Sequence, residues 1–321
     1  MDTSVQVQEL SDSLKTFRDD VFKGLAGPEK TLPCKYFYDA PGSELFDKIC
    51  GLDEYYPTRT ETALLEKYGP EMADLIGPDV CLIEFGCGSL TKTRRLLEAL
   101  DRPALFVPID ISEDHLLRSA ESLAADFQGL DVQPVVADFT RPVDLPEQAR
   151  SGGQKRVGFF PGSTIGNFDH DGAVEFLKTI AEMVSGGGGL LIGADLKKDE
   201  DILVRAYDDE EGITEAFNLN IIERINRELG GDFDVSQFRH LALYNRRLGR
   251  IEIYLESQKD QTVHIQGRDF KFREGETIHT ENSYKYHVEE FSALAQSAGF
   301  ETEKIWVDGG NLFSIHYLTA G

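Results

Sequence analysis

Apolar residues repeat with a helical period near the start of the chain, which predicts a helix over residues 8–26 that Gly27-Pro28 ends. The apolar face of that helix consists of Leu10, Leu14, Phe17, Val21 and Leu25. The next stretch is rich in aromatic residues and has no clear period. Thr58 and Glu61 then have the spacing of a capping box, so we expect a second helix through Leu75. Pro70 should kink or split this helix, because proline cannot donate a backbone hydrogen bond.

Continuous apolar runs alternate with helical patterns through the middle of the chain. The runs are short enough for buried strands, and the segments between them have the length and periodicity of helices. This alternation is typical of a doubly wound parallel sheet. The expected strands are 80–85, 104–109, 133–137, 157–160 and 190–196, and the expected helices are 91–100, 112–127 and 172–184.

The pattern changes after Lys198. Two helices, about 199–208 and 212–229, precede strands at 250–256 and 261–265 whose polar and apolar residues alternate, as in an antiparallel sheet with one wet face. A helix at 287–297 and strands at 301–307 and 312–319 follow. Because a glycine-rich turn joins these last strands, they should form an antiparallel hairpin at the sheet edge. We therefore expect a sheet domain of residues 61–196 and 287–321, and an inserted α+β domain of residues 1–60 and 197–286.

Charge and composition narrow the classes of function. The 321 residues include 33 basic and 57 acidic side chains, a formal net charge of −24, which argues against nucleic acid and anionic membranes as partners. The chain has no transmembrane-length apolar stretch, and its first 20 residues lack the apolar run of a signal peptide. The four cysteines and seven histidines are scattered, so we expect reduced thiols, no metal site and a cytoplasmic protein.

Small and acidic residues follow the first three predicted strands of the parallel sheet. Glycines after the first strand allow a ligand to approach the backbone, and carboxylates after the next two can bind ribose hydroxyls and an exocyclic amine. Because the carboxyl ends of parallel strands meet at one edge, these positions describe a nucleoside crevice. The residues are Gly86, Gly88, Asp110, Asp138 and Phe139. The arrangement resembles class I S-adenosylmethionine (SAM)-dependent methyltransferases, which have a Rossmann-like core and the same C-terminal hairpin.

Two alternatives come from other functional classes. An NAD-dependent oxidoreductase would have a third glycine where this chain has Thr91, and a non-catalytic nucleoside-binding regulator would use the same crevice. The segment Pro161–Asn167 differs from the Asn/Asp-Pro-Pro-aromatic motif of amino-methylating DNA enzymes. Together with the acidic charge, this departure disfavours a nucleic-acid substrate.

Several long sequence blocks resemble a narrower family, the histidine-specific methyltransferases of ergothioneine biosynthesis. The blocks are KYFYDAPGSELFDKIC, EYYPTRTE, FPGSTIGNF, LVRAYDDEEGITEAFNLN and TENSYKY. The resemblance runs from about residue 15 to the C-terminus. It implies three methyl transfers from SAM to the α-amino group of L-histidine, giving hercynine and S-adenosyl-L-homocysteine (SAH), in a cleft between two domains. We expect a monomer whose partner is this small molecule; another α-amino acid, such as tryptophan, is the alternative substrate.

The resemblance also implies roles for individual residues. Tyr38 and Asn167 would meet the substrate amine, and Tyr207 would help to hold the carboxylate. Tyr55, Glu281 and Ser283 would bind the imidazole, where a neutral ring offers one N–H donor and one acceptor. The residues expected to hold SAM are Gly86, Gly88, Lys92, Asp110, Asp138 and Phe139. Two positions depart from the best-known family pattern, because Ile253 replaces Met and Asn282 replaces Val, so the shape of the side-chain pocket is in doubt.

Overall fold

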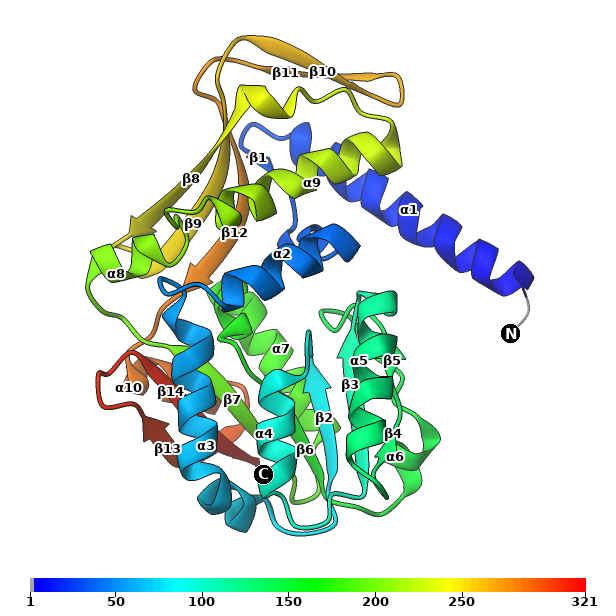
Figure 1. Cartoon of the computed structure of the whole chain (residues 1–321), viewed down its shortest axis with the longest axis vertical. Helices are drawn as coiled ribbons and strands as arrows, with labels where there is room; N and C mark the ends of the chain where they lie inside the picture. Colours follow the sequence, from blue (N-terminus) through cyan, green and yellow to red (C-terminus); the bar gives the residue numbers. More distant parts are fainter. Residues whose placement is uncertain (1–2) are drawn as a thin grey trace. The chain divides into compact units, whose positions relative to one another are not determined.

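The structure is a computed structural model that describes residues 3–321, with side chains from residue 13 onward. The chain divides into two compact units, each built from several segments (Figure 1). The sheet unit comprises Cys50–Ile202, Arg246–Arg250 and Ser283–Gly321. The second unit comprises the segment up to Ile49 together with Leu203–Asn245 and Ile251–Asn282. Residues 50–60 therefore group with the sheet in the structure.

The sheet unit contains an eight-stranded sheet in the order β13-β14-β7-β6-β2-β3-β4, with β5 also pairing with β3. Strands β2, β3, β4, β5, β6 and β7 pair in parallel, whereas β14 runs antiparallel to both β7 and β13. The expected doubly wound sheet and its C-terminal hairpin are thus confirmed. The strands are β2 (Cys81–Phe85), β3 (Leu105–Asp110), β4 (Asp131–Val132), β5 (Val135–Val136), β6 (Arg156–Phe160), β7 (Gly189–Asp195), β13 (Phe300–Val307) and β14 (Phe313–Ala320).

Helices cover both faces of this sheet, and a separate hydrophobic core lies under each layer (Figure 1). One face packs against α3 (Tyr56–Ile76), α4 (Thr91–Ala99) and α5 (Glu113–Asp126). The other packs against α6 (Glu147–Ser151), α7 (His170–Met183) and α10 (Val288–Ser297). Since both faces are covered, the inner strands β2, β6 and β7 are buried at almost every position, which explains the continuous apolar runs in the sequence.

Helix α3 differs from its prediction in two ways. Its N-cap is Tyr55, whose side chain makes no capping hydrogen bond, so the proposed capping box of Thr58 and Glu61 is wrong. The side chain of Glu61 is instead buried on the sheet side of the helix. Pro70 lies inside the helix without splitting it, since α3 continues to Ile76.

The second unit combines a four-stranded sheet, in the order β1-β12-β9-β8, with an antiparallel hairpin of β10 and β11. In α1, Phe17, Val21 and Leu25 are buried and Leu14 is exposed, while the side chain of Leu10 lies outside the described part. Helix α2 and strands β8, β11 and β12 had no counterpart in the sequence prediction. The elements are α1 (Thr3–Leu25), β1 (Lys30–Thr31), η1 (Cys34–Phe37), α2 (Ala40–Cys50), α8 (Glu200–Arg205), α9 (Ile213–Leu229), η3 (Val235–Gln237), β8 (Phe238–Asn245), β9 (Arg250–Ser257), β10 (Gln261–Ile265), β11 (Arg268–Phe272) and β12 (Thr277–Tyr284).

No helix within the described residues combines the length and the apolar character that crossing a membrane would need.

Candidate functional site

The turn after β2 brings four of the predicted cofactor residues together. Gly86 and Gly88 have φ angles of +70° and +50°, a region that glycine adopts without steric cost. The backbone N–H of Gly88 donates to Asp110 Oδ2 at 3.3 Å, which joins the turn to the end of β3. A Cβ atom on Gly86 would lie 3.2 Å from the ring of Phe139, whereas a Cβ on Gly88 would meet nothing within 4 Å. The turn therefore keeps its backbone open next to an aromatic side chain.

Asp110 and Asp138 each anchor the loop that follows them. Asp110 Oδ1 accepts a hydrogen bond from the N–H of Ser112 at 2.9 Å, and Asp138 Oδ1 accepts one from the N–H of Thr140 at 3.0 Å. The ring of Phe139 packs against Phe160 and Phe176, with centroid distances of 5.7 Å to each. These contacts fix both carboxylates at the carboxyl edge of the sheet, where ligands of open α/β folds bind.

Lys92 lies in a buried ion pair with Glu61. The Lys92 Nζ to Glu61 Oε2 distance is 2.6 Å, and the exposed fractions of the two side chains are 15% and 1%. Glu61 Oε2 also accepts the backbone N–H of Gly162 at 2.8 Å. Gly162 has a φ of +81°, a conformation that glycine adopts without steric cost, and this turn presents its N–H to Glu61. Glu61 thus ties α3, α4 and the β6 loop together.

Glu84, at the end of β2, is a second buried acid near this pair. Burial raises the pKa of Glu84 to about 8, although Thr93 and Lys92 oppose the shift. Thr93 Oγ1 donates to Glu84 Oε2 at 2.5 Å. At neutral pH most Glu84 side chains therefore carry a proton, which reduces the repulsion between the acids of this cluster.

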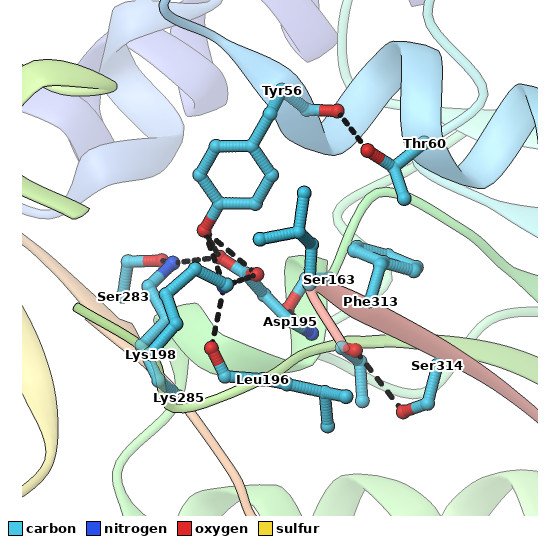
Figure 2. Close-up of polar contacts among 12 residues, drawn as sticks. Tyr56, Thr60, Ser163, Asp195, Leu196, Lys198, Ser283, Lys285, Phe313 and Ser314 are labelled. Atoms are coloured by element: carbon cyan, nitrogen blue, oxygen red, sulfur yellow. Dashed lines mark hydrogen bonds and ion pairs between the residues drawn. The ribbon is translucent and has the colours of Figure 1, made fainter. Parts of the chain in front are cut away.

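A larger buried polar cluster surrounds Asp195 at the end of β7 (Figure 2). Asp195 accepts hydrogen bonds from the Tyr56 hydroxyl at 2.7 and 2.8 Å, and pairs with Lys198 at 2.5 Å and Lys285 at 2.6 Å. Lys285 Nζ also donates to Ser283 Oγ at 2.8 Å. Burial lowers the pKa of Lys198 to about 8 despite the attraction of Asp195.

The loop that carries Asn167 is attached to this cluster. The hydroxyl oxygen of Ser163 accepts the backbone N–H of Asp195 at 2.9 Å. Asn167 is the last residue of the short helix η2 (Thr164–Asn167). The preceding residue, Gly166, lies against the backbone of Tyr284: a Cβ atom on Gly166 would lie 2.7 Å from the carbonyl oxygen of Tyr284. Asn167 and Ser283, two of the predicted substrate residues, therefore lie on adjoining backbone segments, and Tyr55 directly precedes Tyr56 of the cluster.

The remaining predicted substrate residues belong to the second unit. The ring of Tyr38 packs against Phe46 and Phe217, and Ile253 is buried in β9. Asn282 Oδ1 accepts a hydrogen bond from His279 Nε2 at 2.9 Å. Burial and the charge of Glu281 together raise the pKa of the Cys34 thiol to about 12. The thiol is therefore unreactive, as expected for a structural cysteine.

A buried hydrogen-bond network connects the backbone near three of these residues. His240 Nε2 donates to the carbonyl oxygen of Tyr207 at 2.8 Å, and His240 Nδ1 accepts from Asn218 Nδ2 at 2.9 Å. Asn218 Oδ1 accepts from the Thr280 hydroxyl, which also lies 3.1 Å from the carbonyl oxygen of Ile253. The network therefore fixes Tyr207, Ile253 and the strand position next to Glu281.

Sequence reasoning missed the central members of both buried clusters. Asp195 interrupts an apolar strand, and a charge inside such a run is a usable signal of a buried functional or structural group. Glu61 was assigned to a capping box, because an acid three residues after a threonine has the same local pattern. Lys198 and Lys285 have no periodic signature, and the contacts that bring them together, from Lys285 to Asp195 and from Lys198 to Tyr56, join residues that are distant in sequence.

Comparison with known proteins identifies the family. A family model described as histidine-specific methyltransferase, SAM-dependent, matches residues 17–320. The histidine N-alpha-methyltransferase of Mycolicibacterium smegmatis is 39% identical over 94% of each chain, and that of Mycobacterium tuberculosis is 40% identical over 93% of each. An L-tryptophan methyltransferase of Psilocybe serbica is 28% identical over 94% of this chain and 92% of its own. The expected enzyme class is confirmed, and the oxidoreductase alternative is left without support. The chain belongs to the family of histidine-specific, SAM-dependent methyltransferases.

Proposed function

We propose that this protein transfers three methyl groups, one at a time, from SAM to the α-amino group of L-histidine, giving hercynine and releasing SAH. The observation that carries the proposal is the family match over residues 17–320, together with relatives at 39% and 40% identity that are named histidine N-alpha-methyltransferases. The geometry of the sheet edge is compatible with it, because the residues expected to bind SAM follow β2, β3 and β5, and Asn167 follows β6.

The residues at that edge fit the cofactor. The backbone at Gly88 is open, Gly86 leaves room beside the Phe139 ring, and the carboxylates of Asp110 and Asp138 are anchored nearby. In our proposal Asp110 binds the ribose hydroxyls, Asp138 and Phe139 hold the adenine, and Lys92 binds the carboxylate of the methionine part. When bound, SAM supplies a methyl group on a positively charged sulfur, which leaves as a neutral thioether.

The chain's own residues then have a positioning role. Tyr38 and Asn167 hold the neutral amine with its lone pair directed at the methyl carbon, and positioning of this kind supplies most of the rate acceleration of such a transfer. Before each transfer the ammonium form of histidine, or of its mono- or dimethylated product, loses a proton to solvent, which leaves the nitrogen lone pair free. As the new N–C bond forms, the electrons of the old C–S bond remain on sulfur, and the third transfer gives a quaternary nitrogen that has no proton to lose. Aromatic side chains such as Tyr38 can stabilise the trimethylammonium product through cation–π attraction.

Recognition of the histidine side chain is assigned to Tyr55, Glu281 and Ser283. Glu281 accepts the ring N–H, and Ser283 donates to the unprotonated ring nitrogen. Tyr207 helps to bind the carboxylate. The second candidate substrate is tryptophan, which Ile253 and the 28% identical tryptophan methyltransferase favour, since a different residue in the side-chain pocket can admit a larger ring.

Mass spectrometry tests the proposal directly. Histidine incubated with the protein and SAM should gain three methyl groups, and tryptophan in a parallel reaction should gain none. Glu281→Ala should lower kcat/KM for histidine at least a hundredfold, because the ring N–H loses its hydrogen-bond acceptor. Glu289→Ala, a change in the first turn of α10, is the control and should leave activity unchanged. Methylation of tryptophan but not of histidine would refute the proposal.

The cellular setting is part of the same proposal. We propose a cytoplasmic monomer. Light scattering of the purified chain should give the mass of a single copy, and cell fractionation should recover the protein with cytoplasmic markers. A stable dimer or recovery with another compartment would contradict these two statements.

A further inference from the structure

Lys285 determines the direction of a hydrogen bond at Ser283. The ammonium group of Lys285 lies between Ser283 Oγ, at 2.8 Å, and Asp195 Oδ2, at 2.6 Å, and neither Lys285 nor Asp195 has an exposed side chain (Figure 2). An ammonium group has three donors and no lone pair. Ser283 Oγ must therefore accept this hydrogen bond, and the O–H proton of Ser283 is donated to a different atom.

The surroundings keep Lys285 in its charged form. Burial by itself would raise the pKa of Asp195, but the nearby Lys285 and Lys198 outweigh burial and lower it, so this carboxylate is ionised. Tyr56 donates to both oxygens of the same carboxylate and accepts from Lys198 at 2.6 Å. A buried ammonium is retained where it has an ionised partner with good geometry, and Asp195 supplies one.

We propose that Lys285 is a positioning residue that occupies one of the two lone pairs of Ser283 Oγ and, by its positive charge, directs the O–H of Ser283 toward the substrate ring. The site then selects a ring that presents an unprotonated nitrogen to Ser283 and rejects one that presents N–H there. Neutral imidazole satisfies this requirement, whereas imidazolium has N–H on both nitrogens and indole has no acceptor nitrogen. The inference rests on the proposed function, in which Ser283 contacts the imidazole of histidine.

The unmodified protein provides the first test. Histidine binding to the protein saturated with SAH is measured by calorimetry in buffers of different ionisation enthalpy, from about pH 8 to about pH 5.5. Free imidazole has a pKa of about 6.5, so at the lower pH the bound ring must lose a proton that it carries in solution. Proton release per histidine bound should rise by close to one across this range. The release from the amine stays constant there, because the amine titrates at higher pH.

Titratable groups of the protein also contribute to the measured proton release, and a matched variant separates their contribution from that of the histidine ring. The titratable groups joined to Lys285 through Asp195 are Lys198 and Tyr56, and Glu281 and Tyr284 are neighbours of Ser283 in sequence. Ser283→Ala keeps all of them and removes only the hydroxyl. The rise in proton release should therefore be largely absent in Ser283→Ala. An equal rise in both proteins would overturn the inference.

Changes at Lys285 provide the second test. In Lys285→Met no ammonium group directs the Ser283 hydroxyl, which can then turn to accept a ring N–H, so the ratio of histidine affinities at about pH 8 and about pH 5.5 should fall at least fivefold. Lys285→Gln retains an N–H donor and should preserve more of the original ratio. Lys155→Met is the control, because Lys155 also makes two hydrogen bonds, at 3.0 and 3.2 Å, on the sheet unit. If neither Lys285 variant folds, the proton count of the unmodified protein decides.

The outcomes distinguish this inference from the proposed function. Absence of histidine methylation would refute the proposed function. If histidine is trimethylated but proton release on histidine binding does not rise between about pH 8 and about pH 5.5, only the role of Lys285 is overturned.

Discussion

Glu61 on α3 and Lys92 on α4 form a buried ion pair, with 2.6 Å between Oε2 and Nζ, at the carboxyl edge of the parallel sheet. The same carboxylate oxygen accepts the N–H of Gly162, whereas the other oxygen, Oε1, is buried and has no hydrogen-bond partner within the described part of the chain. Breaking such a pair from one side leaves a buried charge uncompensated. The orientation of Lys92 therefore depends on Glu61, a residue on a different helix.

Substitution of Glu61 tests this dependence. Glu61→Gln should raise the Kd of SAH about tenfold or more, equivalent to roughly 1.4 kcal/mol, because Lys92 loses the charge that orients it. Calorimetric titration with SAH measures the effect. Glu66→Gln is the matched control, since Glu66 pairs with Arg95 across the same two helices at 3.1 Å, but on the exposed surface. We expect its Kd to change less than twofold. Equal effects of the two changes would contradict the prediction.

Gly86 tests the open turn after β2. In Gly86→Ala the added Cβ would lie 3.2 Å from the Phe139 ring and would occupy a backbone conformation with φ of +70°. We expect the Kd of SAH to rise at least tenfold, because the ring next to the cofactor must move. Gly129→Ala has the same kind of backbone strain, with φ of +94°, but nothing within 4 Å of the new Cβ. It should lose roughly 1 kcal/mol of stability without weakening SAH binding. Unchanged SAH affinity in Gly86→Ala would show that the contact with Phe139 is irrelevant.

Asn218 tests the buried network of the second unit. Asn218→Ala removes the partners of His240 Nδ1, the Thr280 hydroxyl and the Tyr254 carbonyl oxygen. The free energy of unfolding should fall by about 2–4 kcal/mol, and KM for histidine should rise about tenfold, because Tyr207 and the β9–β12 strands lose their common support. Urea unfolding and steady-state kinetics measure the two quantities.

Asn226 on the same helix separates stability from positioning. Its side chain makes two hydrogen bonds to the backbone of Phe233, each of 2.8 Å. Asn226→Ala should therefore lower stability while leaving KM for histidine unchanged. If Asn226→Ala raises KM as much as Asn218→Ala does, the network has no specific role in substrate binding.

The pH dependence of stability tests the protonation of Glu84. Its pKa is raised to about 8 in the folded protein, above the ordinary value near 4.5. Between pH 4.5 and pH 8 the folded state therefore binds more protons than the unfolded state. The stability that comes from protonated Glu84 is fully present below about pH 4.5 and is lost as the pH rises to about 8. Glu84→Gln should remove a slope of up to roughly 1.4 kcal/mol per pH unit. Urea unfolding at several pH values measures this difference, and a variant with the original slope would refute it.

The strands of the parallel sheet were predictable because burial on both faces imposes a local signal. Residues 80–85 and 190–196 are apolar runs of strand length, and the structure has β2 at Cys81–Phe85 and β7 at Gly189–Asp195. The terminal hairpin was predictable for a similar reason, since a glycine-rich turn joins two strand-length segments. Helix α2 and strands β8, β11 and β12 were not identified, because their half-exposed segments carry a weaker pattern.

For this protein, the sequence by itself determined the doubly wound sheet, the glycine turn at Gly86 and the carboxylates that follow the next strands, since each depends on neighbouring residues. Only the tertiary structure decided that Glu61 is a buried partner of Lys92 rather than a helix cap, and that Lys285 joins Asp195 to Ser283. The physical reason is that an acid or a lysine has the same local pattern in a cap, on a surface or in a buried pair. Its partner and its burial are set by the packing of segments that are distant in sequence.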